Sequence, residues 1–187
     1  MKPPTAKHSE PRMRFFTPEL YLRFNSSDED EVVRAREEWE EAIARYRGRL
    51  ATLRETMPSQ VQKLTELCFH DAEIATRFAD THALPFLPPA PLWTAVAVFV
   101  LRNEDQFSEL IYSLWDQVTE AKAPKRWRFS KERVHWLYDE IDQHAPGQFF
   151  SHTILLSDGK VVRVPFVSVI FHDLGTLTEK TASWQIA

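Results

Sequence analysis

The sequence predicts an α+β domain, in which an N-terminal helical hairpin packs on an antiparallel β-sheet of about five or six strands in meander order. Three observations lead to this expectation. Apolar residues recur every three or four positions through residues 32–57, which is the period of an amphipathic helix. Two β-rich runs, residues 149–156 and 161–171, flank an Asp-Gly turn signal. Val96, Val98 and Val100 alternate within an apolar run typical of a buried strand.

Composition indicates a globular chain. It has 187 residues, of which 43% are hydrophobic and 27% are charged. The net charge of −4 argues against a nucleic-acid partner, and the apolar stretch at residues 95–101 is too short to cross a membrane. One cysteine excludes an intramolecular disulfide, and the N-terminus has no apolar signal region, so we expect a cytoplasmic protein. The 4 glycines form no nucleotide-binding fingerprint, and we expect no cofactor.

The chain divides into a tail and one domain. Residues 1–12 are polar and rich in proline, so we expect disorder there and a single domain over residues 13–187. Its helical part should cover residues 13–69 and its sheet part residues 70–175. Thr17-Pro18-Glu19 predicts the start of a short helix that ends near Asn25, because proline is favoured at the first helical position.

A long helix should follow, capped by Ser27 and ended by Pro58. Its expected buried stripe consists of Val32, Trp39, Ile43, Tyr46, Leu50, Leu53 and Met57. The charged residues on the opposite side, such as Glu41 and Arg45, should face solvent. Residues 59–68 predict a second helix that completes the hairpin.

The sheet part is predicted strand by strand. Residues 72–78 should form the first long strand and residues 92–102 a buried one, separated by a proline-rich surface connection at residues 80–91. Residues 107–118 fit helical spacing, yet Leu110, Tyr112 and Leu114 also alternate as in a strand. Residues 134–142 favour a strand over a short helix.

The hairpin at Asp158-Gly159 sets the expected register. With a two-residue type I′ loop, Gly159 has a positive φ, Leu155 lies opposite Val162, and His152 lies opposite Pro165. His152 and Arg163 are then diagonal neighbours on one face of the sheet.

Four short motifs are spread over most of the chain. They are Arg14-Phe15-Phe16-Thr17-Pro18-Glu19, His70-Asp71-Ala72-Glu73-Ile74, Trp136-Leu137-Tyr138-Asp139-Glu140-Ile141-Asp142 and His152-Thr153-Ile154-Leu155-Leu156-Ser157-Asp158-Gly159. Together they resemble an uncharacterised bacterial family of domains of unknown function. The resemblance implies helices followed by an antiparallel sheet, and it favours a strand at residues 107–118. It implies no activity. A similar plan among bacterial toxin-immunity proteins suggests a binding role.

The candidate ligand or partner site consists of His70, Asp71, Asp139, Glu140, His152 and Arg163. We expect His152, Arg163 and the neighbouring acids to converge on the sheet, either as a binding site or as a polar cluster with purely structural roles. His70-Asp71 also suggests a metal-dependent hydrolase, although the histidines lack ligand spacing and we expect no metal. Three hypotheses follow: a non-enzymatic protein-binding domain, a His-Asp hydrolase, and a structural homodimer built on the long helix.

Overall fold

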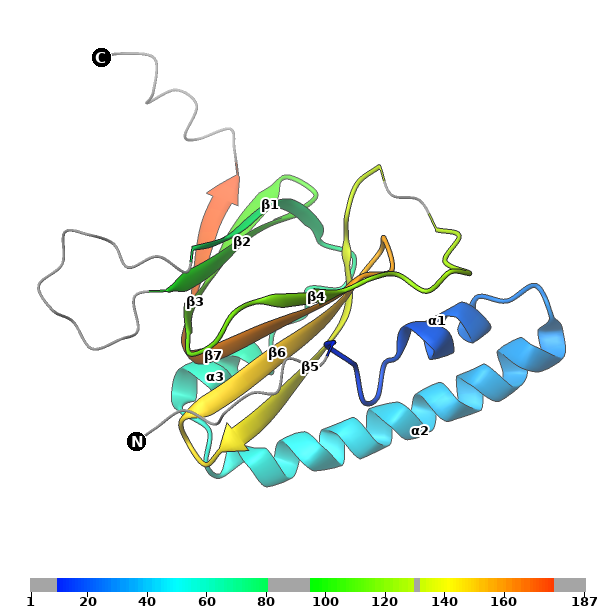
Figure 1. The fold of residues 1–187 in the computed structure, drawn as a ribbon, viewed down its shortest axis with the longest axis horizontal. Coiled ribbons are helices and arrows are strands. Elements are labelled where there is room, and N and C mark those ends of the chain that lie inside the picture. Colours follow the sequence, from blue (N-terminus) through cyan, green and yellow to red (C-terminus); the bar gives the residue numbers. More distant parts are fainter. Residues whose placement is uncertain (1–9, 81–94, 130–131, 177–187) are drawn as a thin grey trace, which may run out of the picture.

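The computed structural model describes residues 10–80, 95–129 and 132–176, and within them helices precede strands (Figure 1). The helices are α1 (Pro18–Phe24), α2 (Glu29–Arg54) and α3 (Ser59–Leu64). The strands are β1 (Glu73–Asp80), β2 (Val96–Asn103), β3 (Gln106–Leu114), β4 (Thr119–Ala121), β5 (Trp136–Ala145), β6 (Phe149–Leu156) and β7 (Val161–Thr176). The predicted α+β class is confirmed. No described helix is long and apolar enough to span a membrane.

The described strands form one antiparallel sheet that curls into a half-barrel. The strand order is β1-β2-β3-β7-β6-β5, and β4 pairs with the start of β7. The curl brings the beginning of β1 to the residues that precede β5. There Asp71 N–H donates to Trp136 O at 2.8 Å, and Ile74 N–H donates to Val134 O at 2.7 Å.

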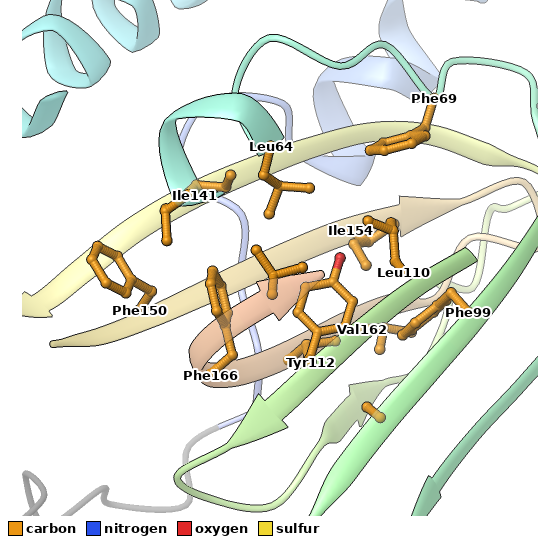
Figure 2. Close-up of a cluster of buried hydrophobic side chains, with 14 of the residues drawn as sticks. Leu64, Phe69, Phe99, Leu110, Tyr112, Ile141, Phe150, Ile154, Val162 and Phe166 are labelled. Carbon is orange, nitrogen blue, oxygen red and sulfur yellow. The ribbon is translucent and has the colours of Figure 1, made fainter. Parts of the chain in front are cut away.

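A larger apolar core fills the inside of this curl. Figure 2 shows Tyr112, Phe166 and Phe99 pointing from β3, β7 and β2 into the space that Leu64 of α3 covers. Leu53 and Met57, at the end of α2, also belong to this core. The end of α2 and α3 therefore close the open side of the curled sheet.

A smaller core lies on the outer face of the same sheet. It joins Phe16 and Leu20 to Trp39 of α2 and to Leu155 of β6. In Figure 1, α1 lies between the sheet and α2, and α2 runs along the lower edge of the sheet. Ile141 N–H of the edge strand β5 donates to the Tyr46 hydroxyl of α2 at 2.7 Å, so the helix protects this edge.

Both predicted helix starts exist, and the cap of α2 differs by one residue. Thr17 accepts a hydrogen bond from Leu20 N–H at 3.2 Å with Pro18 in the first turn, and α1 ends at Phe24 with Asn25 as its C-cap, near the predicted end. Asp28, and not Ser27, caps α2 by accepting from Asp30 and Glu31 N–H. A carboxylate cap adds a negative charge at the positive end of the helix dipole.

The apolar stripe of α2 is partly confirmed. Trp39, Leu53 and Met57 are buried, whereas Ile43, Tyr46 and Leu50 are only partly buried. The helix ends at Arg54, before Pro58, because Thr56 and Met57 N–H form tighter bonds to the carbonyls three residues earlier. α3 ends at Leu64, shorter than the predicted residues 59–68.

The strands predicted from alternation are present. Leu110, Tyr112 and Leu114 are at most 2% exposed, and β3 is a strand, as the family resemblance favours. β1, β2 and β5 also match their predicted regions within a few residues. Most of the proline-rich connection, residues 81–91, and the expected tail at residues 1–9 lie outside the described residues.

The β6–β7 hairpin has a different register from the predicted one. Leu155 lies opposite Val161 and His152 opposite Val164, one residue away from the expected pairs. Gly159 has φ +84° as predicted, but Asp158 does not adopt a positive φ. Gly159 N–H donates to Leu156 O and Leu156 N–H donates to Lys160 O, which makes a three-residue loop with glycine in the left-handed position.

Candidate functional site

His152 lies inside the curled sheet as part of a buried polar chain. Its side chain is 0% exposed. Nδ1 is 2.8 Å from the Tyr112 hydroxyl, and Nε2 is 3.1 Å from Asp139 Oδ1. Trp136 Nε1–H donates to the other oxygen of Asp139 at 2.7 Å. The chain therefore connects β3, β6 and β5 through four side chains.

The protonation of this chain follows from its burial. Desolvation, with a further contribution from the Asp139 charge, raises the pKa of Tyr112 well above its ordinary value. The hydroxyl therefore keeps its proton and shares a hydrogen bond with Nδ1 of His152. The Nε2–Oδ1 contact is close but poorly aligned for a hydrogen bond. His152 Nδ1 is therefore hydrogen-bonded, whereas buried Nε2 has only this contact with Asp139. Because His152 has no solvent contact, the chain presents no reactive group at the surface.

Glu140 points to the opposite face of β5 and holds the N-terminal segment. Its side chain is buried, and its carboxylate accepts from Arg14, Phe15 and Phe16 N–H at 2.8, 2.6 and 2.7 Å. Desolvation raises the pKa of Glu140 despite these three hydrogen bonds, and the neighbouring Asp139 charge adds to the increase. Glu140 is therefore an anchor between residues 14–16 and the sheet.

His70 and Asp71 shape the turn that leads into β1. His70 Nδ1 is 2.6 Å from Leu137 O, and its ring packs on Tyr138. Asp71 adopts φ +63°, while its exposed carboxylate lies 3.4 Å from His70 Nε2. In the part of the chain that the structure describes, no three His, Cys, Asp or Glu side chains are grouped to hold a metal ion. His70 and Asp71 therefore have a structural role, in which they form the turn before β1.

Arg163 lies on the outer face of the sheet, away from His152. It pairs with Thr153 of β6, whereas His152 pairs with Val164 in the inner core. The predicted convergence of His152 and Arg163 is therefore wrong, because a one-residue change of register moves a side chain to the other face. Of the six candidate residues, Asp139 and His152 are in contact, His70 contacts Asp71, and Glu140 and Arg163 stand apart.

A surface groove that the sequence analysis did not predict lies between α3 and β7. Its volume is about 470 Å³. It is lined by Gln60, Lys63, Leu64, Glu66, Leu67, Val169, Ile170 and Phe171. Ile170 is 51% exposed and Phe171 is 41% exposed, which is unusual for large apolar side chains. The uncharged run at residues 168–171 is the only local signal, since the groove depends on contacts between distant segments.

The same part of β7 has a free edge. β6 pairs with β7 only as far as Phe166, while β3 continues along β7 to its end. Beyond that point no described strand pairs with the second edge of β7, which borders the groove beside α3. The backbone groups that point to this edge are available to a further strand.

Fold and surface together describe a curled-sheet α+β domain with an apolar groove beside an open strand edge. Comparison with protein-family models, with curated proteins and with solved structures finds no match to this chain. The family resemblance of the short motifs remains a prediction.

Proposed function

We propose that this chain is a non-enzymatic binding protein that holds an extended segment of a partner protein along the free edge of β7. The observation that carries the proposal is this edge, paired with β3 on one side and bordered by the α3 groove on the other. Peptide recognition by addition of a strand uses the same two features: backbone hydrogen bonds supply affinity, and adjacent pockets select side chains.

The chemistry of the edge favours an extended chain over other ligands. A row of free backbone N–H and C=O groups is matched by another extended backbone, and a helix cannot pair with it because its own backbone groups are already bonded. Exposed edges usually carry charges or proline that prevent such pairing. Residues 168–171, Ser-Val-Ile-Phe, carry neither.

The groove indicates which residues the bound segment of the partner should contain. Leu67, Ile170 and Phe171 offer apolar surface, which suits side chains at alternate positions of an added strand. Glu66 at the groove is paired with Arg54, whereas Lys63 has no acidic partner among the described residues. We therefore expect a segment with alternating apolar residues and an acidic residue near Lys63.

The alternative functions have less support. The hydrolase hypothesis relied on His70 and Asp71, whose described contacts are those of a structural turn. The homodimer hypothesis relied on α2, whose apolar residues Trp39 and Leu53 are buried against the chain's own sheet and N-terminal segment. An immunity-like role, in which the bound segment belongs to a toxin, is the particular case that the motif resemblance suggests.

Selection of phage-displayed random linear peptides on the whole purified chain tests the proposal. We expect enrichment of peptides with alternating apolar residues, and Phe171→Lys should weaken the binding of the selected peptide about tenfold or more. Val33→Lys is the matched control, because Val33 is an exposed apolar residue, 57% accessible, on α2. In an added strand, every second backbone N–H of the peptide points to β7. Methylation of these nitrogens should abolish binding, whereas methylation of the alternate set should not.

Two outcomes would reject the proposal. Peptides that bind equally well to Phe171→Lys, or that tolerate both methylation patterns, do not pair with the edge. A stable dimer of the wild type that Phe171→Lys dissociates would show that a second copy of the chain occupies the edge instead. The methylation result is independent of any effect of the substitution on folding.

A further inference from the structure

Arg163, on the outer face of the sheet, has no anionic partner among the described residues. Its guanidinium lies 6.0 Å from the centre of the Trp115 ring, and among the described residues it makes a polar contact with His144 Nε2 at 3.2 Å. Asp116, next to Trp115, accepts from Gln117 N–H and forms no ion pair with Arg163, and two other nearby acids have basic partners of their own. Asp142 pairs with Arg49, and Glu120 pairs with Arg77 and Lys160. Arg163 forms no ion pair among the described residues, and most of its five N–H donors have no described acceptor.

A buried hydroxyl without a hydrogen-bond partner among the described residues lies on β4, the strand paired with β7 at Arg163. Thr119 of β4 is the direct cross-strand neighbour of Arg163 on β7, so the two side chains share a face. Directly opposed residues in an antiparallel pair have Cβ atoms about 4.5–5.5 Å apart. Thr119 Oγ1 is buried and has no hydrogen-bond partner in the described part of the chain. Such an atom is costly unless something else satisfies it.

His144 does not neutralise this charge and cannot act as an anion. Its Nε2 is 2.9 Å from Ser151 Oγ and also faces Arg163. Desolvation, followed by the Arg163 charge, lowers the pKa of His144, while the Asp142 charge acts in the opposite direction. The imidazole is therefore neutral near pH 7, and Trp115 contributes a ring with no charge. Together, Arg163, His144 and Trp115 therefore carry one positive charge, that of Arg163, which no described anion balances. This charge lies in a partly buried position.

We propose that Arg163, Thr119 and Trp115 form a binding site for the oxyanion of a small ligand, either a carboxylate or a phosphate group. The guanidinium supplies two parallel donors that match either oxyanion, and the Thr119 hydroxyl supplies a further donor from the neighbouring strand. The Trp115 ring offers an apolar surface to the part of the ligand that carries the anion. This site lies on β4 and β7 outside the inner core and does not depend on the peptide-binding edge.

NMR titration of His144 tests the site. Inorganic phosphate and acetate are added separately at constant ionic strength, with sodium chloride as the control anion, and the His144 imidazole signals are followed against pH. A bound oxyanion next to His144 favours its charged form, so we expect the pKa of His144 to increase with saturating phosphate or acetate. The stronger of the two responses identifies which oxyanion the site prefers.

Two substitutions separate binding from structure. Arg163→Gln should weaken binding about tenfold or more, because it removes the charge and both parallel donors. Thr119→Val removes a buried unpaired hydroxyl at nearly constant shape, so it should weaken oxyanion binding while leaving thermal stability without ligand unchanged or improved. Arg77→Gln is the control, because that arginine already has Glu120 as its partner.

The proposal is overturned if chloride produces the same His144 response as phosphate and acetate. It is also overturned if binding survives Arg163→Gln, or if Thr119→Val lowers stability and leaves binding intact. That last result would show that the Thr119 hydroxyl serves folding alone.

Discussion

The Glu140 carboxylate accepts three backbone hydrogen bonds, from Arg14, Phe15 and Phe16, and so fixes the N-terminal segment to β5. Replacement by alanine leaves these N–H groups without their acceptor close to the outer core. We expect Glu140→Ala to lower the free energy of unfolding by about 2–5 kcal/mol, because each unsatisfied buried donor costs about 1–3 kcal/mol and water can satisfy some of them. Urea denaturation measures the loss. Asp142→Ala on the same strand removes only a partly exposed ion pair with Arg49 and should cost at most about 1 kcal/mol.

The pH dependence of this loss has a defined sign. Because desolvation raises the pKa of Glu140 above its ordinary value of 4.5, the folded state binds the proton more tightly than the unfolded state does. The contribution of the group to stability is complete below pH 4.5 and is lost as the pH rises through the folded pKa. The stability advantage of wild type over Glu140→Ala should therefore grow as the pH falls from 7 towards 4.5. An advantage that shrinks over this range would mean that the three hydrogen bonds outweigh desolvation.

At the scale of elements, α2 contributes to stability through few of its residues. Leu53 is 6% exposed and belongs to the inner core, whereas Val33 on the same helix is 57% exposed. We expect Leu53→Ala to cost about 2–5 kcal/mol, since it removes buried methyl groups and leaves a cavity. Val33→Ala should stay within about 0.5 kcal/mol of wild type, as surface changes usually do. Equal small losses for both variants in thermal denaturation would contradict the packing of α2 on the sheet.

Sequence periodicity predicts elements better than it predicts their pairing. The long helix and the left-handed Gly159 follow from local spacing and turn chemistry, whereas residues 107–118 fit helical spacing and the strand at β3 is favoured by the family resemblance. The hairpin register does not follow from turn chemistry, because Asp-Gly fits both a two-residue loop and a three-residue loop with glycine last. All eight residues of β6 are buried, so the strand lacks the contrast between polar and apolar faces that would select one register. That single uncertainty placed Arg163 beside His152 in the sequence analysis.

The surface features depend on contacts that local patterns do not contain. The edge of β7 is free because β6 ends opposite Phe166 while β3 continues, and strand lengths in a sheet are a property of the whole topology. Likewise, Trp115 and His144 lie far apart in the sequence and meet only because β7 brings Arg163 between their elements. The sequence identifies Arg163 and His152 as unusual residues in strands, but their partners require the fold.

At the scale of the whole molecule, the inner and outer cores share one sheet. Ile154 and Leu155 are neighbours on β6, each fully buried, yet Ile154 belongs to the inner core and Leu155 to the outer core. Neither core can open without exposing the strands that form a wall of the other. The molecule should therefore unfold as one cooperative unit, because the two cores share the strands of one sheet.

Denaturation of two variants on opposite sides of β6 tests this coupling. Leu155→Ala should cost about 2–5 kcal/mol and Ile154→Val about 0.5–1.5 kcal/mol, each by lowering the same transition. Tryptophan fluorescence, which reports on Trp39 in the outer core and Trp136 in the inner core, should give the same urea midpoint as far-ultraviolet circular dichroism for both variants. Leu155→Ala is the stronger test, because independent cores would let the outer layer of α1, α2 and residues 13–16 detach first. In that case the fluorescence and circular dichroism midpoints would differ for Leu155→Ala and would coincide for Ile154→Val, and the cooperative description would be wrong.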